Sequence, residues 1–390
     1  MNAVQYKIIF YLIFLVLTGC TGKLPEWLKS DDLVVKPTEL VPFEPQLEPK
    51  ILWSNQVGQG NNRSYNIVQP LLTTTSVVTV DYRGNVYNTE KSSGKRLWKI
   101  ALNIPVATNA GGNDKFLFIG SQEGELITLD TKTGRYLWRA QLSSEILTPP
   151  QVNEEIVIVR TSDGKISAFS VQTGNIIWQY ERAIPLLSLR GDSTVSIEEN
   201  TVVAGYANGR LVALSLSDGK VMWEKTISLP RGRTEIDRLV DIDATPVIQN
   251  GLIYTVAYQG NLSVLELYTG RQVWSRELSS TVGLDVADDG TVYITDDQSY
   301  VWAIQADTGN GLWRQTSLSR RKVTTPAIAG DYIIVADLDG YIHWLSKKDG
   351  RFIARQKIAE EAITSQAVIA QSQMFILSQD GQLTAIAIPQ

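Results

Sequence analysis

The sequence predicts an all-β fold, an eight-bladed β-propeller of four-stranded antiparallel blades, and three observations lead to this prediction. A Gly and a Trp recur four residues apart, the Trp positions follow one another at intervals close to 40 residues, and short runs of alternating apolar residues fill the intervals. Self-similarity at a fixed period indicates a repeat architecture. Four short strands in about 40 residues make one propeller blade.

The Gly-Trp spacing occurs six times, and a seventh copy has lost its Trp. The copies are Gly94/Trp98, Gly134/Trp138, Gly174/Trp178, Gly219/Trp223, Gly270/Trp274, Gly309/Trp313 and Gly350/Ala354. From Trp98 onward the steps to the next Trp position are 40, 40, 45, 51, 39 and 41 residues. We expect these Trp residues to be structural, each one a large apolar plug between neighbouring blades.

Each repeat has the same internal order, which the third copy shows in full. An alternating apolar run at 148–159 is followed by a Gly turn, a second alternating run at 161–170, and a Thr-Gly turn that leads into the Trp strand at 172–178. Because Gly adopts positive φ without a steric penalty, such turns between runs of period two predict tight hairpins. Each repeat is therefore expected to form a small antiparallel sheet.

The strands that follow the Gly turns give the number of blades. Eight such strands begin at Gly84, Gly124, Gly164, Gly209, Gly260, Gln298, Gly340 and Gly381. Only seven strands of the Gly-Trp type follow them, whereas an unpartnered Ile-Leu-Trp segment lies at 51–53. We expect this N-terminal strand, with Trp53, to complete the eighth blade, because closure of the ring removes its open edge.

The charge of the chain argues against nucleic acid as a partner. The net charge is -5 and the isoelectric point is near 5.2, and no block of clustered Lys and Arg occurs that could neutralise phosphates. Hydrophobic residues make up 43% of the chain, which is enough to build an extensive core of stacked sheets.

The N-terminus has the pattern of an export signal. Ten apolar residues run from Ile8 to Leu17 after a single Lys7, a stretch that is too short to span a bilayer but typical of a signal peptide. The run ends in Leu-Thr-Gly-Cys, which resembles the bacterial lipobox, so residues 1–19 are expected to be removed and Cys20 to be lipidated. Thr21 follows where Asp would direct inner-membrane retention. The resemblance therefore implies an anchor in the outer membrane, facing the periplasm.

Residues 20–50 are expected to form a tether between this anchor and the propeller at 51–390. Five prolines interrupt regular structure in the segment: Pro25, Pro37, Pro42, Pro45 and Pro49. Proline-rich segments of this kind favour an extended, semi-rigid chain.

A search for catalytic and cofactor chemistry is largely negative. The chain has one histidine, His343, and one cysteine, which do not suffice for a metal site of the His/Cys type. A Ser-His-Asp set would depend on the same His343, which is better explained as a packed blade residue beside Trp344. No phosphate-binding Gly loop occurs in a strand-turn-helix context. We expect no catalytic residue, no cofactor and no metal.

The two longest repeats contain the candidate functional residues. Their extra residues form a first insert at Ile184–Ser193 and a second insert at Pro230–Pro246. Both follow a Trp strand and precede the first strand of the next blade, so we expect the inserts to lie side by side on one rim. Apolar residues next to Arg, as in the first insert, have the composition of an interface hot spot.

The lipobox, the eight repeats and the two inserts together resemble the BamB family, lipoproteins of the outer-membrane β-barrel assembly machinery (BAM complex). The inserts contain the motifs Leu-Ser-Leu-Arg-Gly at 187–191, Thr-Glu-Ile-Asp-Arg-Leu at 234–239 and Asp-x-Asp-x-Thr-Pro at 241–246. The resemblance implies a non-enzymatic subunit that binds the periplasmic POTRA domains of BamA and assists folding and insertion of β-barrel outer-membrane proteins. By motif, the residues that dock on BamA are Leu187, Leu189, Arg190, Asp241 and Asp243. Unfolded outer-membrane proteins are a further possible partner, held along exposed sheet edges.

Two other functions are compatible with the repeats. A dehydrogenase that binds pyrroloquinoline quinone on the propeller axis has similar Trp repeats, but such enzymes commonly carry an adjacent Cys pair over the cofactor, which this chain lacks. A propeller that serves as a scaffold for another envelope partner is the second alternative. The insert residues also have structural explanations: Leu187 and Leu189 as inward strand residues, and Asp241 and Asp243 as turn or calcium residues.

Overall fold

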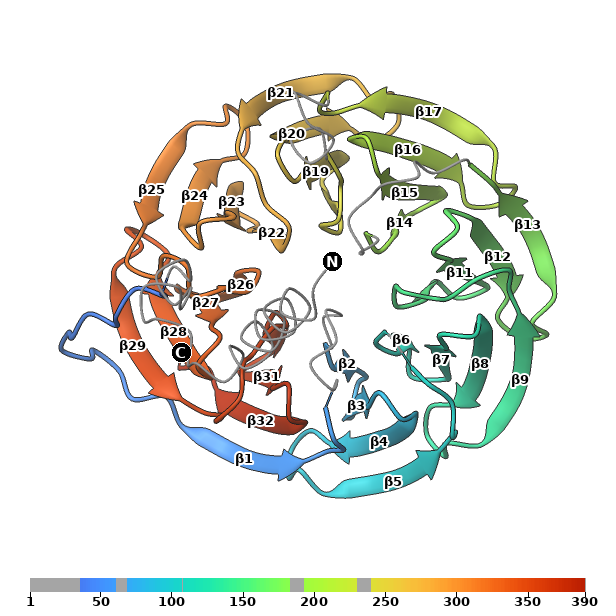
Figure 1. Cartoon of the computed structure of the whole chain (residues 1–390), viewed down its shortest axis with the longest axis horizontal. Helices are drawn as coiled ribbons and strands as arrows, with labels where there is room; N and C mark the ends of the chain where they lie inside the picture. The colour runs from blue at the N-terminus through green and yellow to red at the C-terminus, as the bar shows by residue number, and fades with distance from the viewer. Residues whose placement is uncertain (1–35, 61–68, 107, 183–192, 230–239, 390) are drawn as a thin grey trace, which may run out of the picture. The chain divides into compact units, whose positions relative to one another are not determined.

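The computed structural model describes residues 36–60, 69–106, 108–182, 193–229 and 240–389. Within these ranges every regular element is a β-strand, and the strands form eight four-stranded antiparallel sheets arranged as the blades of a ring (Figure 1). No helix that could cross a membrane occurs in them. The predicted all-β, eight-bladed propeller is confirmed.

The first four blades each contain four strands in chain order, counted from the axis outward. Blade 1 comprises β2 (Leu71–Leu72), β3 (Ser76–Val80), β4 (Asn85–Glu90) and β5 (Arg96–Ala101). Blade 2 comprises β6 (Gly111–Gly112), β7 (Phe116–Gly120), β8 (Glu125–Asp130) and β9 (Tyr136–Gln141). Blade 3 comprises β10 (Gln151–Val152), β11 (Ile156–Arg160), β12 (Ile166–Ser170) and β13 (Ile176–Tyr180). Blade 4 comprises β14 (Ser196–Glu198), β15 (Thr201–Tyr206), β16 (Arg210–Ser215) and β17 (Val221–Thr226).

The next three blades repeat this order, and the last one is closed by the N-terminal strand. Blade 5 comprises β18 (Val247–Gln249), β19 (Leu252–Val256), β20 (Asn261–Glu266) and β21 (Gln272–Glu277). Blade 6 comprises β22 (Gly283–Val286), β23 (Thr291–Thr295), β24 (Val301–Gln305) and β25 (Gly311–Gln315). Blade 7 comprises β26 (Ala327–Ala329), β27 (Tyr332–Ala336), β28 (Tyr341–Ser346) and β29 (Phe352–Lys357). Blade 8 comprises β30 (Val368–Ala370), β31 (Gln373–Leu377), β32 (Gln382–Ala387) and β1 (Ile51–Gln56).

The ring closes as the sequence predicts. Strand β1 pairs antiparallel with β32 and so becomes the outer strand of blade 8, with Trp53 opposite Ala385. This pairing joins the first and last parts of the propeller by backbone hydrogen bonds, and it covers sheet edges that would otherwise be free.

The recurring Gly-Trp spacing arises from a contact that each Trp makes with the next blade. The indole Nε1 of Trp178 donates to the carbonyl of Leu216 in the next blade at 2.7 Å, and six other Trp residues make the equivalent bond, at 2.7–3.2 Å. Each indole also lies on the turn glycine of the next blade: a Cβ added to Gly219, which has φ +69°, would stand 2.5 Å from the Trp178 ring. Trp and Gly of one copy therefore serve opposite interfaces of the same blade.

These Trp residues pack against the buried clusters between neighbouring blades, but most of them remain partly exposed. Only Trp178 and Trp223 are buried, each 8% exposed. The remaining five are partly exposed to solvent: Trp53, Trp98, Trp138, Trp274 and Trp313. All seven lie on the outermost strand of a blade, where the indole bonds and packs against the next blade. The residues of the surrounding segments decide how much of each ring stays exposed at the perimeter.

The five partly exposed indoles are nevertheless packed against core residues. Trp138 lies against Phe118, with ring centroids 5.9 Å apart, and Trp313 lies against Tyr293 at 5.8 Å. Trp274 packs on the buried cluster between blades 5 and 6, and its Nε1 donates to the carbonyl of Ala306 at 2.7 Å. Each of these side chains therefore covers the outer end of an interface between blades and does not fill its centre.

Every outer strand carries a β-bulge near its beginning, at its second residue. The register shift precedes the Trp position in all eight blades, and the bulged residues are Leu52, Leu97, Leu137, Ile177, Met222, Val273, Leu312 and Ile353. A bulge interrupts the row of backbone groups that an edge strand presents to another chain. The perimeter is thereby protected against edge-to-edge association, and addition of a long extended client chain there is disfavoured.

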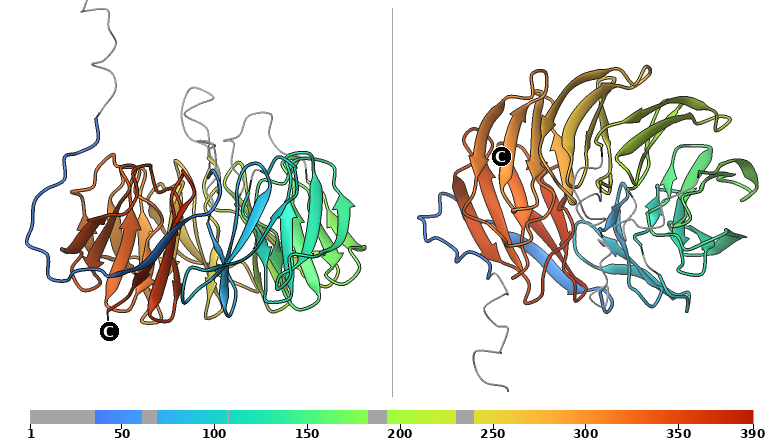
Figure 2. Two further views of the ribbon diagram at one scale, coloured as in Figure 1. Left: turned by 90° about the horizontal axis from the view of Figure 1, so that it is seen from below. Right: turned by 45° about the horizontal axis from the view of Figure 1, so that its top comes forward.

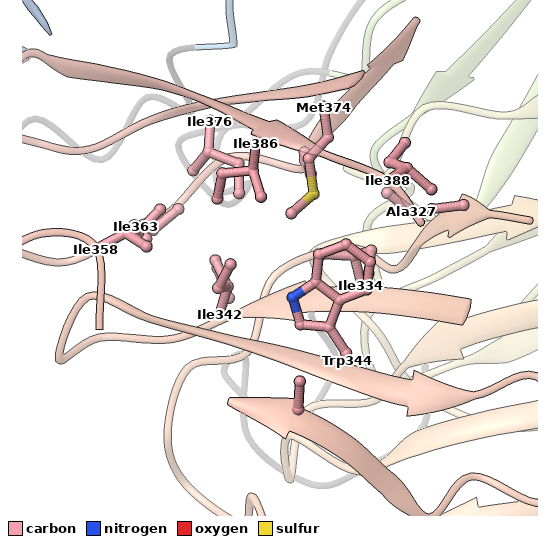
Figure 3. Close-up of a cluster of buried hydrophobic side chains, with 14 of the residues drawn as sticks. Ala327, Ile334, Ile342, Trp344, Ile358, Ile363, Met374, Ile376, Ile386 and Ile388 are labelled. Carbon is pink, nitrogen blue, oxygen red and sulfur yellow. The ribbon is translucent and has the colours of Figure 1, made fainter. Parts of the chain in front are cut away.

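Blade 7 reverses the pairing of large and small residues that the other blades share. In those blades the outer-strand Trp lies opposite a small or medium-sized residue of the third strand, for example Ala213 opposite Trp223. In blade 7 the third strand carries Trp344 and the outer strand carries Ala354 opposite it. Trp344 is fully buried in the cluster between blades 7 and 8 (Figure 3). The core thus keeps its volume although the Trp of the seventh copy is lost.

Residues 38–50, which the sequence analysis assigns to the tether, run along the outside of blade 7 before entering β1 (Figures 1 and 2). The amide of Gln46 donates to the carbonyl of Ile353 at 2.8 Å, and the amide of Thr38 donates to that of Ser319 at 3.1 Å. Phe43 stacks on Phe352 with ring centroids 5.3 Å apart. We call these thirteen residues, 38–50, the strap.

Candidate partner-binding surface

The structure describes two of the predicted docking residues. Asp241 and Asp243 lie in the last part of the second insert, which leads into β18. Leu187, Leu189, Arg190 and the predicted lipidation site Cys20 lie outside the described residues. The site is therefore built from the described ends of the two inserts.

The second insert ends in a buried segment that is attached to blade 4. Asp241 is 3% exposed and forms an antiparallel bridge with Ala207, the residue after β15. Its carbonyl accepts a hydrogen bond from the amide of Tyr258 at 2.8 Å. Asp243 is half-buried two residues later. These backbone hydrogen bonds hold the segment between blades 4 and 5, so the backbone that carries the two aspartates has a fixed position.

The first insert is held at both of its ends. Arg182 precedes it, and its Nη2 lies 2.8 Å from Oε1 of Glu224 on β17. Glu224 also pairs with Arg210, and its pKa is lowered to about 2, first by the hydrogen bond from Arg182. Ser193 ends the insert as a fully buried residue, and its Oγ accepts a hydrogen bond from the amide of Gly205 at 3.2 Å.

The ends of the two inserts meet at Gly205. A Cβ at this position would stand 2.4 Å from Cγ2 of Ile242, which follows Asp241, and 2.9 Å from Oγ of Ser193. The Ser196 hydroxyl on β14 adds a hydrogen bond to the carbonyl of Pro246. The described residues thus show that the C-terminal ends of the two inserts are neighbours at adjacent blades.

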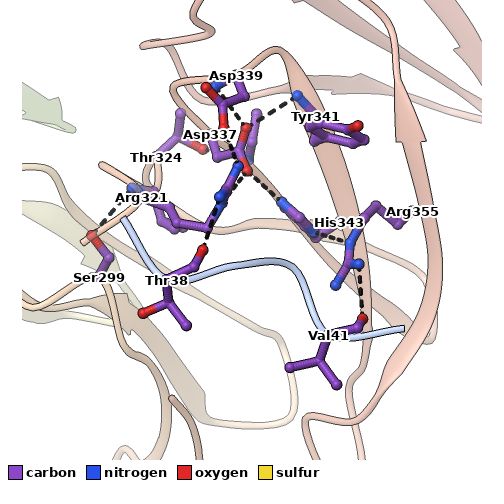
Figure 4. A network of polar contacts seen from close by, with 12 residues as sticks. Thr38, Val41, Ser299, Arg321, Thr324, Asp337, Asp339, Tyr341, His343 and Arg355 are labelled. Atoms are coloured by element: carbon purple, nitrogen blue, oxygen red, sulfur yellow. Dashed lines mark hydrogen bonds and ion pairs between the residues drawn. The ribbon is translucent and has the colours of Figure 1, made fainter. Parts of the chain in front are cut away.

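The single histidine belongs to a buried polar network in blade 7 (Figure 4). Nε of Arg355 lies 3.1 Å from Nδ1 of His343, and because arginine can only donate, Nδ1 is the acceptor. The proton is therefore on Nε2, which donates to Oδ2 of Asp337 at 2.9 Å. Nε of Arg321 donates to the same oxygen at 2.7 Å. This set of partners fully occupies the imidazole and leaves it no role as a metal ligand.

The network also fixes the strap. Nη1 of Arg321 donates to the carbonyl of Thr38 and Nη1 of Arg355 to that of Val41, both at 3.0 Å (Figure 4). The Arg355 guanidinium carbon lies 5.0 Å from the centre of the Phe43 ring, within the range of a cation–π contact. The network is therefore structural, and it attaches residues 38–43 to blade 7.

The charges of this network lower the affinity of His343 for a second proton. Its pKa lies below the usual value, first because burial disfavours the imidazolium, and further because Arg355 and Arg321 are positively charged. The hydrogen bond to Asp337 acts in the opposite direction without offsetting these effects. The pKa of Asp337 is lowered although burial acts to raise it, because the hydrogen bonds from His343 and Arg321 favour the carboxylate.

We expect this histidine to make the fold less stable as the pH falls below about 6.5, the pKa of an unfolded histidine. Below that pH the unfolded chain binds one proton that the folded chain does not, so the free energy of unfolding decreases by up to about 1.4 kcal/mol per pH unit. Asp285 and Asp297, whose pKa values are raised by burial, act in the opposite direction. The measurement is therefore urea unfolding of wild type and His343→Gln between pH 7 and pH 5. Equal slopes in the two proteins would contradict the assignment.

The described ranges contain no group of three or more His, Cys, Asp or Glu that could hold a metal ion. Sequence reasoning missed Arg160, Arg182 and Tyr206, which lie around the ends of the first insert. An alignment of the repeats would reveal Arg160, because other blades have small or aliphatic residues or Thr at that position.

The comparisons with known proteins agree with this description. A family model described as outer membrane protein assembly factor BamB matches residues 82–315 and 300–390. The chain is 34% identical over 381 residues to the outer membrane protein assembly factor BamB of Escherichia coli (strain K12), covering 95% of this chain and 96% of that relative. It is 37% identical over 375 residues to the protein of the same name from Pseudomonas aeruginosa, covering 96% of each.

Solved structures show the same fold. A crystal structure of BamB from Moraxella catarrhalis matches with a TM-score of 0.79 at 28% sequence identity, and covers 87% of this chain and 100% of that chain. The quinohemoprotein alcohol dehydrogenase from Comamonas testosteroni matches with a TM-score of 0.69 at 12% identity, over 87% of this chain and 76% of that chain. This second likeness concerns the propeller architecture alone.

Proposed function

Since the chain belongs to the BamB family of outer membrane protein assembly factors, we propose that it is a non-enzymatic lipoprotein subunit of the BAM complex. In this role it binds the periplasmic POTRA domains of BamA and assists folding and insertion of β-barrel outer-membrane proteins. The docking residues are Leu187, Leu189 and Arg190 of the first insert and Asp241 and Asp243 of the second.

One observation carries the proposal beyond the family relationship. The ends of the two inserts, Ser193 and Asp241–Ile242, are joined on consecutive blades through Gly205 and Ala207. Residues separated by about 50 positions in the sequence therefore leave the propeller at one place. A rigid support that brings together the ends of two loops with apolar and charged residues is what a protein interface requires.

The anchoring part of the proposal concerns the N-terminus. Cys20 is the proposed lipid attachment site in the outer membrane, with the propeller on the periplasmic side. Because the strap binds to blade 7 from Thr38 onward, the tether between lipid and propeller consists of residues 20–37. At roughly 3 Å per residue in an extended chain this allows about 50 Å.

The test is binding of the soluble chain, beginning at Thr21, to the purified periplasmic region of BamA from the same organism. We expect wild type to bind and Leu189→Ala/Arg190→Ala to lose binding, because removing a central interface residue typically costs about 2 kcal/mol or more. The matched control is Arg96→Ala/Leu97→Ala, which removes an adjacent Arg and Leu, both exposed, from β5 of blade 1. The control protein should bind like wild type.

Circular dichroism and thermal unfolding of each variant accompany the binding measurement. A wild-type protein that does not bind, or a folded insert variant that binds as well as wild type, would contradict the proposed docking surface.

A further inference from the structure

We propose that Arg160 and Tyr206 are positioning residues for partner binding: they fasten the ends of both inserts to blades 3 and 4 and so hold the docking residues in place. The inference rests on the proposed function. We call Arg160, Arg182, Ser193, Tyr206 and Asp241 the insert hub.

Arg160 ends β11 in blade 3 and reaches across to blade 4. Its side chain is buried, with the residue 3% exposed. Nη1 donates to the carbonyl of Ser193 at 3.1 Å and to that of Gly205 at 2.6 Å, and lies 3.2 Å from Oγ of Ser193. One guanidinium group thus connects the last residue of the first insert to the strand that receives the second insert.

None of the other blades has an arginine at the equivalent position. The residues with the same register are Val80, Gly120, Gly205, Val256, Thr295, Ala336 and Leu377. In blade 6 the short Thr295 makes the corresponding contact between blades, donating to the carbonyl of Thr324 at 2.8 Å. Burying an arginine carries a large desolvation penalty. Packing of the blades therefore does not require an arginine at this position. The long side chain of Arg160, which extends to Gly205, occurs only in the blade that precedes the first insert.

Tyr206 lies at the centre of the hub. The guanidinium carbons of Arg160 and Arg182 lie 4.5 and 5.7 Å from the centre of its ring, so one aromatic side chain touches the residue that precedes the first insert and the arginine that binds its last residue. Its hydroxyl donates to the carbonyl of Gly164 in blade 3 at 3.2 Å. Its own carbonyl faces the amide of Ile242 at 3.4 Å, at the end of the second insert. One residue therefore contacts the ends of both loops.

This arrangement has a consequence for affinity. A loop whose ends are fixed loses less conformational entropy when a partner orders it, and this pre-organisation strengthens binding without any new contact. Neither Arg160 nor Tyr206, both buried, needs to touch the partner for the effect to occur. Loosening the hub should weaken binding while the docking residues themselves stay unchanged.

The experiment measures affinity for the periplasmic region of BamA by isothermal titration calorimetry, together with the thermal unfolding midpoint, for wild type and four variants. Arg160→Met removes the hub contacts and keeps an unbranched side chain. Thr295→Val removes the corresponding bond in blade 6 and serves as the control for lost stability alone. Arg182→Ala removes the other contact to the Tyr206 ring, and its control Arg210→Ala removes the second partner of Glu224 but leaves Arg182 in place.

We expect Arg160→Met and Arg182→Ala to bind roughly tenfold more weakly than wild type, and Thr295→Val and Arg210→Ala to bind like wild type even where their unfolding midpoints fall. Wild-type affinity of folded Arg160→Met would overturn the inference and leave the proposed function standing. If Arg160→Met does not fold, the affinity of Arg182→Ala is the test, and wild-type affinity of that variant would overturn the inference. Absence of binding by wild type would overturn the proposed function and this inference with it.

Discussion

Replacement of Trp344 by alanine is expected to lower the free energy of unfolding by about 3–5 kcal/mol, the usual cost of removing a large buried aromatic side chain. Trp344 is fully buried between blades 7 and 8 and packs edge-on against Tyr332 at 5.5 Å. Its partner across the strands is Ala354, which is too small to fill the space that the substitution leaves. Urea unfolding followed by far-ultraviolet circular dichroism measures the loss.

The double variant Trp344→Ala/Ala354→Trp should recover much of this loss, because it restores the arrangement of the other seven blades. Ala354→Trp alone overpacks the interface and is expected to cost about 1–3 kcal/mol. In the double variant the new indole can donate to a carbonyl of blade 8, whereas Nε1 of Trp344 has no hydrogen-bond partner within the described ranges. If the double variant lost as much unfolding free energy as the two single variants together, the proposed exchange of a large for a small residue would be refuted.

Asp337→Ala is expected to cost about 3–5 kcal/mol, because it leaves the charge of Arg321 buried without its principal partner. Arg321 is 4% exposed, and its Nε is paired with Asp337 at 2.7 Å. The same carboxylate also accepts hydrogen bonds from Nε2 of His343 and from two backbone amides of its own turn. The measurement is again urea unfolding at pH 7, with limited proteolysis of residues 38–50 to report on the strap.

The sister turn in blade 1 supplies the control for this prediction. Asp81 is buried and accepts the amides of Arg83 and Asn85 as Asp337 accepts those of its own turn, but no buried arginine pairs with it among the described residues. Asp81→Ala should therefore cost only about 1–2 kcal/mol, the contribution of the lost hydrogen bonds. Equal losses in the two variants would show that the turn, and not the buried ion pair, carries the stabilisation.

Much of the fold is predictable because the residues that make the contacts between blades recur at a short, fixed spacing in the sequence. A Trp and a Gly four residues apart serve the two interfaces of one blade, so the spacing appears once per blade and the number of blades can be counted. The closure by β1 follows from the unpartnered segment around Trp53. Periodicity and turn chemistry suffice for both conclusions.

The degree to which each Trp is enclosed does not follow from the spacing. Trp138, Trp274 and Trp313 have the same Gly-Trp motif as Trp178 and Trp223, yet only the last two are buried. The motif places every indole on the outer strand, and the residues of other segments around it decide how much of the ring solvent reaches.

The exchange in blade 7 could not be predicted, because it depends on strand register. The sequence shows that Ala354 has replaced a Trp and that Trp344 follows His343. Only the pairing of β28 with β29 reveals that Trp344 and Ala354 face each other. The contacts of the strap are equally non-local, since Thr38 and Val41 bind arginines about 300 positions away.

Of the candidate site, the sequence predicts that the two inserts lie next to each other, and it does not reveal the contacts that hold their ends. The positions of Asp241 and of the end of the first insert follow from the lengths of the repeats. The insert hub depends on contacts between blades 3, 4 and 5, such as the one between Arg160 and Gly205. Leu187, Leu189 and Arg190 remain predictions from sequence.

Hydrogen–deuterium exchange of the soluble chain, alone and saturated with the periplasmic region of BamA, tests the proposed docking surface most directly. We expect protection to increase at residues 184–193 and 230–246, and the outer strands of blades 1, 7 and 8 to exchange as in the free protein. Complex formation with protection confined to other blades, and unchanged exchange in both inserts, would contradict the proposed surface.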